Sequence, residues 1–295
     1  MERSQRIAGC LIGGAIGDAL GWPVEFLSMS AIRKAYGEDG IDDLVKNKEN
    51  LAEFTDDTQM TLFTVDGVLR YLGAKKKTQK EADFTKIMHA SYRRWLFTQQ
   101  APRDEDMRLL NGWLYPHREL HVRRAPGNSC LSALSEPWIG TIGDPINTSK
   151  GCGAVMRAAP IGLVFDAEEA FTKGMIAGAL THGHPSGYLG SAALARIIAE
   201  LLRGESLSYA LGTTMERLKS ETGHEECVLY LKKAYELALA EIEPTRSIEA
   251  LGLGWVAEEA LAIAVYCALK FENDGQRALR YAVNHDGDSD STGAI

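Results

Sequence analysis

Two short acidic motifs, more than two hundred residues apart, constrain the fold of this chain more than any other feature. The first runs from Thr55 to Thr58 and reads Thr-Asp-Asp-Thr, and the second runs from Asp286 to Ser291 and reads Asp-Gly-Asp-Ser-Asp-Ser. Each could do no more than begin a helix, since hydroxyl and carboxylate side chains cap the free N–H groups of a first turn. Alternatively, the motifs meet around hard cations, because ligand sets made of oxygen atoms select magnesium, manganese or calcium over zinc.

The arrangement of the carboxylates favours two cations over one. On a helix, the side chains of Asp56 and Asp57 project about 100° apart, so one small ion would bind both poorly. Asp288 and Asp290, at a second helix start, could reach the same ions from the other side. Without cations, four crowded carboxylates would have raised pKa values and would destabilise the fold. A shared site would therefore bring the two ends of the chain together, whereas two separate helix caps would not.

A helix rich in glycine is expected at residues 7–20. Gly9, Gly13 and Gly17 recur every four residues, which clears one face of the helix so that another helix can approach closely. This spacing is familiar from membrane helices, but the length of the segment and the charge of Asp18 favour a core helix.

Glu25 follows this helix, between Val24 and Phe26. Apolar neighbours could desolvate its carboxylate and raise the pKa, which would suit acid or base chemistry. The alternative is a surface glutamate beside a turn.

The rest of the chain shows helical periodicity and no convincing run of alternating strands. The helix that begins at Thr55 is expected to end near Leu72, because Gly73 and a run of lysines follow. An all-α fold is therefore predicted, with a single domain spanning residues 1–295. Further helices are expected at residues 82–98, 170–180, 187–202, 214–242 (interrupted by Gly223), 256–271 and 278–284.

Gly151-Cys152-Gly153 forms a turn before a helix, an arrangement whose N–H groups can cradle phosphate oxygens. It is not a P-loop, because Lys150 precedes the glycines. His182 lies at a junction between two helices, where it could bind a ligand phosphate or ribose, or cap a helix. For both elements, the alternative is a helix entry without a ligand.

Composition narrows the environment and the partners. A net charge of −8 argues against nucleic-acid binding by bulk electrostatics. Five cysteines form no C-x-x-C pair, which favours buried thiols in a reducing, cytoplasmic setting. No signal peptide opens the sequence, and the apolar run at residues 260–269 is too short to span a bilayer, so no membrane is expected.

Five motifs in this order resemble the ADP-ribosylglycohydrolases, the group that includes dinitrogenase reductase-activating glycohydrolase and the ADP-ribosylarginine hydrolases. The resemblance implies an all-α fold with a cleft holding two metal ions, and cleavage of the bond between ribose C1″ of ADP-ribose and a protein side chain. The motifs are Gly13-Gly14-Ala15-Ile16-Gly17-Asp18-Ala19-Leu20-Gly21 with Glu25, Phe54-Thr55-Asp56-Asp57-Thr58, Lys150-Gly151-Cys152-Gly153-Ala154-Val155-Met156-Arg157, Thr181-His182-Gly183-His184 and Gly287-Asp288-Ser289-Asp290-Ser291.

The resemblance also implies roles for individual residues. Glu25 and Asp57 would be catalytic, and the cofactors would be two magnesium ions, with manganese as a substitute. Gly151, Cys152, Gly153 and His182 would hold the phosphates and ribose of the substrate. The metal ligands would be Thr55, Asp56, Asp57, Asp288, Asp290 and Ser291.

The implied activity is hydrolysis of an ADP-ribosylated protein, with ADP-ribose as product. The form Lys-Gly-Cys-Gly at residues 150–153 is similar to that of the arginine-specific branch more than the serine-specific branch. Two other functions stay open: an immunity protein that neutralises an ADP-ribosylating toxin by hydrolysis or by plugging its active site, and a module that binds ADP-ribose without turnover. The sequence stops at Ile295 whereas family members usually continue, so a truncated or naturally short C-terminus is expected.

Overall fold

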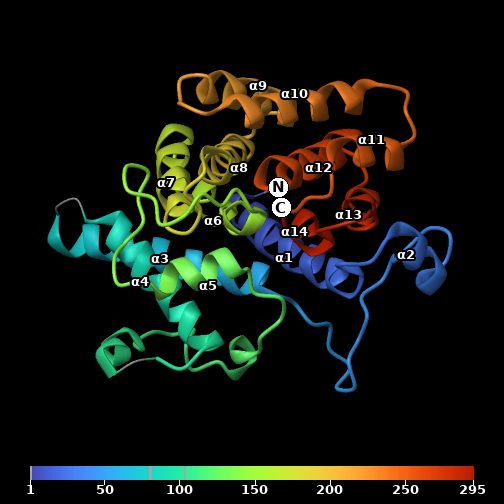
Figure 1. The fold of residues 1–295 in the computed structure, drawn as a ribbon. Coiled ribbons are helices and arrows are strands. Elements are labelled where there is room, and N and C mark those ends of the chain that lie inside the picture. The colour runs from blue at the N-terminus through green and yellow to red at the C-terminus, as the bar shows by residue number, and fades with distance from the viewer. Residues whose placement is uncertain (1, 80–81, 103) are drawn as a thin grey trace.

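A computed structural model describes residues 2–79, 82–102 and 104–295 of the chain. Within these ranges the fold is helical, with two isolated β-bridges and no longer strand pairing, which confirms the all-α prediction (Figure 1). The α-helices are α1 (Arg3–Gly21), α2 (Met29–Tyr36), α3 (Asp56–Thr78), α4 (Phe84–Gln99), α5 (Asn128–Ser135), α6 (Ala159–Gly162), α7 (Ala167–Ala179), α8 (Pro185–Arg203), α9 (Leu207–Leu218), α10 (Glu225–Leu239), α11 (Pro244–Leu251), α12 (Ala257–Lys270), α13 (Gly275–Val283) and α14 (Ser289–Ala294).

Helix α14 packs against α1 over a surface of glycines (Figure 1). A Cβ atom added at Gly14, Gly17 or Gly21 would lie less than 3.0 Å from a backbone oxygen of α14. Close helix packing is therefore present, but the predicted set of contact glycines was wrong in part. A Cβ atom added at Gly9 or Gly13 would have no atom within 4 Å. The reason is length: α14 has six residues and covers only the C-terminal half of α1.

One stretch of the described residues, Arg3–Val24, is long and apolar enough to cross a membrane, with a mean hydropathy of 1.4. This is weak evidence, because length and composition alone give the result and a core helix passes the same test. Residues 17–21 of α1 are buried, as a core helix requires, whereas Ile12 and Ile16 are exposed.

Helix α3 is longer than the sequence indicated. Its predicted end near Leu72 was wrong, since the helix continues through Gly73 and the lysines to Thr78, and Gln79 then adopts a left-handed conformation with φ 53°. The residues after Gly73 are alanine and lysine, which favour helix, and lysines in a last turn interact well with the helix dipole.

Apolar side chains form two main cores. The first core lies among α8, α10 and α12 and includes Leu189, Leu231 and Leu261. The second lies among α3, α4 and α7 and includes Phe63 and Trp95. The acidic motifs lie at the starts of α3 and α14, and the packing of the helices fixes the position of these starts.

Candidate metal centre and adjoining cleft

A cleft of about 310 Å³ brings together ten of the eleven residues that the sequence suggested for a site. The carboxylates come from three elements: the C-cap of the 3₁₀ turn Trp22–Val24, the start of α3 and the start of α14. The ten residues are Glu25, Asp56, Asp57, Gly151, Cys152, Gly153, His182, Asp288, Asp290 and Ser291.

Thr55, the eleventh residue, is fully buried and does not line the cleft. Its hydroxyl accepts the N–H of Asp57 at 3.3 Å and donates to Oδ2 of the same residue at 3.2 Å. It therefore caps α3 and orients the Asp57 carboxylate. A role as a metal ligand remains a prediction.

Asp18 positions the first acidic motif, and no role for it was suggested by the sequence. Its buried carboxylate accepts the N–H groups of Thr55 and Thr58, each at 2.9 Å, and also the Thr58 hydroxyl. These bonds tie the start of α3 to α1. The available signal was a lone carboxylate in an apolar, glycine-rich helix, since such a group needs hydrogen-bond partners when buried.

The carboxylates of the cleft crowd one another. Glu25, Asp288 and Asp290 each offer an oxygen within 4.8 Å of the other two. Burial, followed by the charges of Asp290 and Asp288, raises the pKa of Glu25 to about 10. Burial is also the main cause that raises the pKa of Asp56 and of Asp288 to about 8. At neutral pH, these carboxylates would give up protons readily only in exchange for cations.

The donor set fits a hard divalent cation. Oε2 of Glu25 and Oδ1 of Asp57 are buried and have no hydrogen-bond partner among the described residues. None of the carboxylates of the cleft forms a salt bridge with a described lysine, arginine or histidine. Buried carboxylates without partners are costly, and metal coordination by oxygen ligands removes that cost.

The opposite wall of the cleft is the turn Gly151–Gly153, and it is already hydrogen-bonded within the protein. The N–H of Gly151 donates to Oγ of Ser149 at 3.3 Å, and the N–H of Cys152 donates to the carbonyl of Trp255 at 3.1 Å. The Lys150 carbonyl accepts the N–H of Ala257 at 2.8 Å, which ties the turn to the start of α12. Two N–H groups of the predicted phosphate cradle are thus occupied.

The imidazole of His182 lies against Gly151 and Gly153. A Cβ atom at Gly151 or Gly153 would lie 3.4 Å from Nε2 of His182, so larger residues would crowd the imidazole. On its other side, Nδ1 lies 2.8 Å from Oγ1 of Thr181, and that oxygen accepts Nη2–H of Arg157 at 2.7 Å.

The surroundings of the imidazole set its charge. Arginine can only donate, so Oγ1 of Thr181 accepts from Arg157, and Nδ1 of His182 either accepts the Thr181 hydroxyl or donates to its second lone pair, depending on the tautomer. Burial and the charge of Arg157 lower the pKa of His182 to about 3. His182 is therefore a neutral imidazole on the glycine wall of the cleft.

Cys152 links the two walls. Its thiol donates to Oδ2 of Asp288 at 2.7 Å, and the Ser291 hydroxyl lies 3.6 Å from its sulfur. Burial is the main cause that raises the pKa of the Cys152 thiol well above its usual value, so it stays protonated and serves as a donor. Sequence reasoning placed Cys152 in a phosphate-binding turn and missed this contact, which depends on the packing of α14.

Other lining residues were not suggested for the site. Residues 125–129 form one edge, where the N–H of Gly127 donates to Oδ2 of Asp56 at 3.2 Å. Phe26 and Trp255 lie at another part of the lining. Turn chemistry had indicated a loop at residues 123–129, but no local pattern showed that it would lie over the start of α3.

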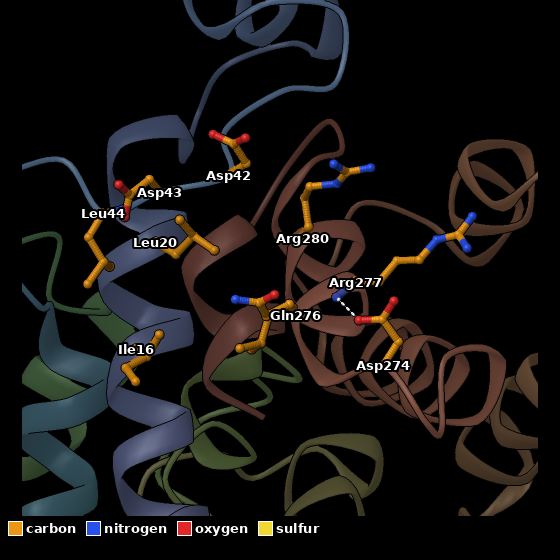
Figure 2. A pocket seen from close by; sticks show the side chains of 10 residues that line it. Ile16, Leu20, Asp42, Asp43, Leu44, Asp274, Gln276, Arg277 and Arg280 are labelled. Atoms are coloured by element: carbon orange, nitrogen blue, oxygen red, sulfur yellow. Dashed lines mark hydrogen bonds between the residues drawn. The ribbon is translucent and has the colours of Figure 1, made fainter.

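A second cavity, of about 480 Å³, lies between α1, the loop at residues 42–44 and α13 (Figure 2). It shares no lining residue with the carboxylate cleft. Its charges are mixed: Figure 2 shows Asp42 and Asp43 opposite Arg277 and Arg280. The Asp274 carboxylate there accepts the backbone N–H of Arg277 and so caps α13. Nothing in this cavity resembles the carboxylate cluster.

Comparison with known proteins identifies the family. The family model described as ADP-ribosylglycohydrolase matches residues 1–295. The chain belongs to the ADP-ribosylglycohydrolase family. This family is one of hydrolases that generally bind divalent metals, act on ADP-ribosylated substrates and release ADP-ribose.

Two relatives match almost the whole of this chain over about 85% of their own length. An uncharacterized protein of Archaeoglobus fulgidus is 27% identical over 99% of this chain and 85% of its own length. The uncharacterized protein YegU of Escherichia coli K12 is 24% identical over 99% of this chain and 86% of its own. A solved structure described as an ADP-ribosylglycohydrolase-related protein complex matches with a TM-score of 0.65 at 23% identity, over 100% of this chain and 85% of that one, which shows the shared fold.

Proposed function

We propose that this chain is a single-domain, magnesium-dependent hydrolase that removes ADP-ribose from modified arginine side chains of proteins. The observation that carries the proposal is the meeting, in one cleft, of carboxylates from the 3₁₀ turn, α3 and α14 with no cationic side chain beside them among the described residues. A site of this kind is built for cations, because nothing else in the described structure compensates the buried charge.

Two magnesium ions, or manganese in their place, would be held by Asp56, Asp57, Asp288 and Asp290, with the hydroxyls of Thr55 and Ser291 in support. Bound there, the ions would supply positive charge that orients ribose hydroxyls and lowers the pKa of water. Cys152 would keep Asp288 in place through its thiol.

The reaction is the addition of water across the bond between ribose C1″ and the side-chain nitrogen. The hydroxyl of water goes to C1″, and its proton goes to the departing guanidine. Glu25 would take part in this proton transfer, since its Oε2 is buried and lacks another partner among the described residues. His182, in the neutral tautomer protonated at Nε2, would hold an acceptor oxygen of the ribose or phosphate, with Gly151 and Gly153 giving the ligand room.

The preference for arginine rests on the Lys-Gly-Cys-Gly form of residues 150–153. In the structure, Lys150 forms salt bridges with Glu226 at 2.9 Å and Glu258 at 2.5 Å, so its charge fixes the turn to α10 and α12 and does not face the cleft carboxylates.

The test is release of free ADP-ribose from proteins modified on arginine and on serine, with magnesium and with excess chelator. Magnesium-dependent release from the arginine conjugate is expected. Release from the serine conjugate alone would overturn the arginine preference. Tight ADP-ribose binding by a folded protein that releases none would point instead to a binding module.

A further inference from the structure

Two aromatic side chains form a stacked pair at the mouth of the carboxylate cleft. The rings of Phe26 and Trp255 are 5.2 Å apart, with planes 20° from parallel. Both residues line the cleft, yet 66% of Phe26 and 36% of Trp255 is exposed to solvent. The pair therefore presents ring surface to anything that enters.

The conformation of Phe26 is unfavourable by itself. Its φ of 66° lies in the left-handed region, which a bulky residue without special cause avoids. Strain of this kind gathers at functional sites, where the surrounding structure maintains it. Phe26 is also 66% exposed, so burial of its ring offsets little of this strain, and a functional reason for its position beside the cleft is indicated.

The pair joins the two walls of the cleft at its rim. Phe26 directly follows Glu25, the carboxylate that lies close to Asp288 and Asp290. Trp255 precedes Val256, the N-cap of α12, and its carbonyl accepts the N–H of Cys152 in the glycine turn. A folded protein substrate is too large for a cleft of about 310 Å³, so a modified side chain would reach the carboxylates past these two rings.

We propose that Phe26 and Trp255 form the subsite for the leaving side chain and select a flat, cationic guanidinium. This inference rests on the proposed function and deepens it. A guanidinium stacks on aromatic faces through cation–π attraction, and the Glu25 carboxylate lies one residue away. A serine hydroxyl offers neither a plane nor a charge, so the pair would discriminate between the two linkages.

The experiment compares Phe26→Leu and Trp255→Leu with wild type, and uses Phe26→Tyr as the conservative variant that keeps the ring. Trp138→Leu is the matched control, because Trp138 is 50% exposed but does not line the cleft. Ligands are a peptide ADP-ribosylated on arginine, the same peptide modified on serine, and free ADP-ribose. Dissociation constants are measured in a Glu25→Gln background, so that turnover is not required, and steady-state kinetics are measured in the parent.

Each leucine variant should weaken binding of the arginine conjugate, and raise its KM, about fivefold to thirtyfold, the range of a lost cation–π contact. The affinity for free ADP-ribose and for the serine conjugate should stay within about twofold, since neither carries a guanidinium. Trp138→Leu should behave like wild type, and Phe26→Tyr, which keeps the ring, should retain the preference for the arginine conjugate.

Two results would overturn the proposal. Equal loss for arginine and serine conjugates would mean a general effect on the cleft, and weaker binding of free ADP-ribose would place the nucleotide base on the aromatic pair. A wild-type enzyme that hydrolyses neither conjugate would refute the proposed function separately, because the binding comparison still reports whether the pair recognises the guanidinium.

Discussion

The two walls of the cleft differ in how completely their polar groups are satisfied. On the acidic wall, Glu25 and Asp57 each keep a buried oxygen without a partner among the described residues. On the glycine wall, the N–H groups of Gly151 and Cys152 and the imidazole Nδ1 of His182 all have partners inside the protein. These three groups of the glycine wall have partners without a ligand, whereas the two carboxylate oxygens of the acidic wall do not.

This difference indicates how the two walls meet their ligands. A wall fixed by internal hydrogen bonds is preorganised and loses little entropy when a substrate binds. A wall of crowded carboxylates stores unfavourable electrostatic free energy that a cation releases. Substitutions and conditions should therefore affect the acidic wall through metal and charge, and the glycine wall through substrate orientation.

The largest effect is expected from Asp57→Ala. Loss of this carboxylate should remove metal binding, and kcat/KM for release of ADP-ribose should fall by at least about 10³-fold, because metal stabilisation of charge is worth several kcal/mol. Activity and magnesium binding by calorimetry are the two measurements. Asp42→Asn, an exposed aspartate outside the cleft, is the control and should change neither. Full activity of Asp57→Ala would contradict a metal-dependent mechanism.

For the acidic wall, the sequence predicted features that depend on local pattern better than contacts between residues distant in the chain. Asp56 and Asp57 could be placed at a helix start from local pattern, whereas their meeting with Asp288 and Asp290 was one of two alternatives that the sequence left open. The thiol contact of Cys152 and the bonds made by Asp18 could not be foreseen, since they depend on how α1, α3 and α14 pack.

The glycine wall and the helix boundaries show the same limit. The helical class was predicted, but the end of α3 was not. Gly73 indicated the end of the helix, whereas α3 continues through it and the lysines that follow to Thr78. The turn at Gly151 was recognised as a site of close approach. That the approaching group is His182 itself required the three-dimensional arrangement.

The second prediction concerns stability without metal. The pKa values of Asp56 and Asp288 are about 8, and that of Asp290 about 7, each raised mainly by burial above a usual value of about 4. Between about pH 4 and pH 8, the folded state holds more protons than the unfolded state, so the free energy of unfolding falls as the pH rises. In chelator, the free energy of unfolding should fall by roughly 3 kcal/mol between pH 5 and pH 8. The melting temperature should drop by about 5 °C over the same range.

Magnesium is the matched test of that pH dependence. At pH 8 a saturating concentration should restore the melting temperature by mass action, whereas at pH 5 protons compete and the gain should be smaller. Asp288→Asn should flatten the pH dependence in chelator, because one of the titrating groups is gone. A melting temperature independent of both pH and magnesium would contradict the inference that the crowded carboxylates destabilise the fold in the absence of cations.

A smaller effect is expected from Glu25→Gln. The amide keeps the size of the side chain but cannot accept a proton in the reaction, so turnover should slow by about 10²-fold, the lower end for acid–base catalysis. Magnesium affinity should change far less than in Asp57→Ala. Calorimetry with magnesium and steady-state kinetics separate the two residues, and equal loss of metal in both variants would make Glu25 a ligand and not a catalytic group.

The smallest effect belongs to the glycine wall. Thr181→Val keeps the shape of the side chain but removes the hydroxyl that accepts Nη2–H of Arg157 and lies 2.8 Å from Nδ1 of His182. The imidazole proton is then free to move to Nδ1, and loss of one hydrogen bond to the ligand should weaken ADP-ribose binding about tenfold, while magnesium affinity is unchanged. Thr181→Ser retains the hydroxyl and should bind like wild type. Nitrogen NMR of His182 should report Nε2–H in wild type and a mixture in Thr181→Val; an unchanged tautomer with weaker binding would show that Thr181 acts by packing, and the contrast between the walls would then rest on the acidic side alone.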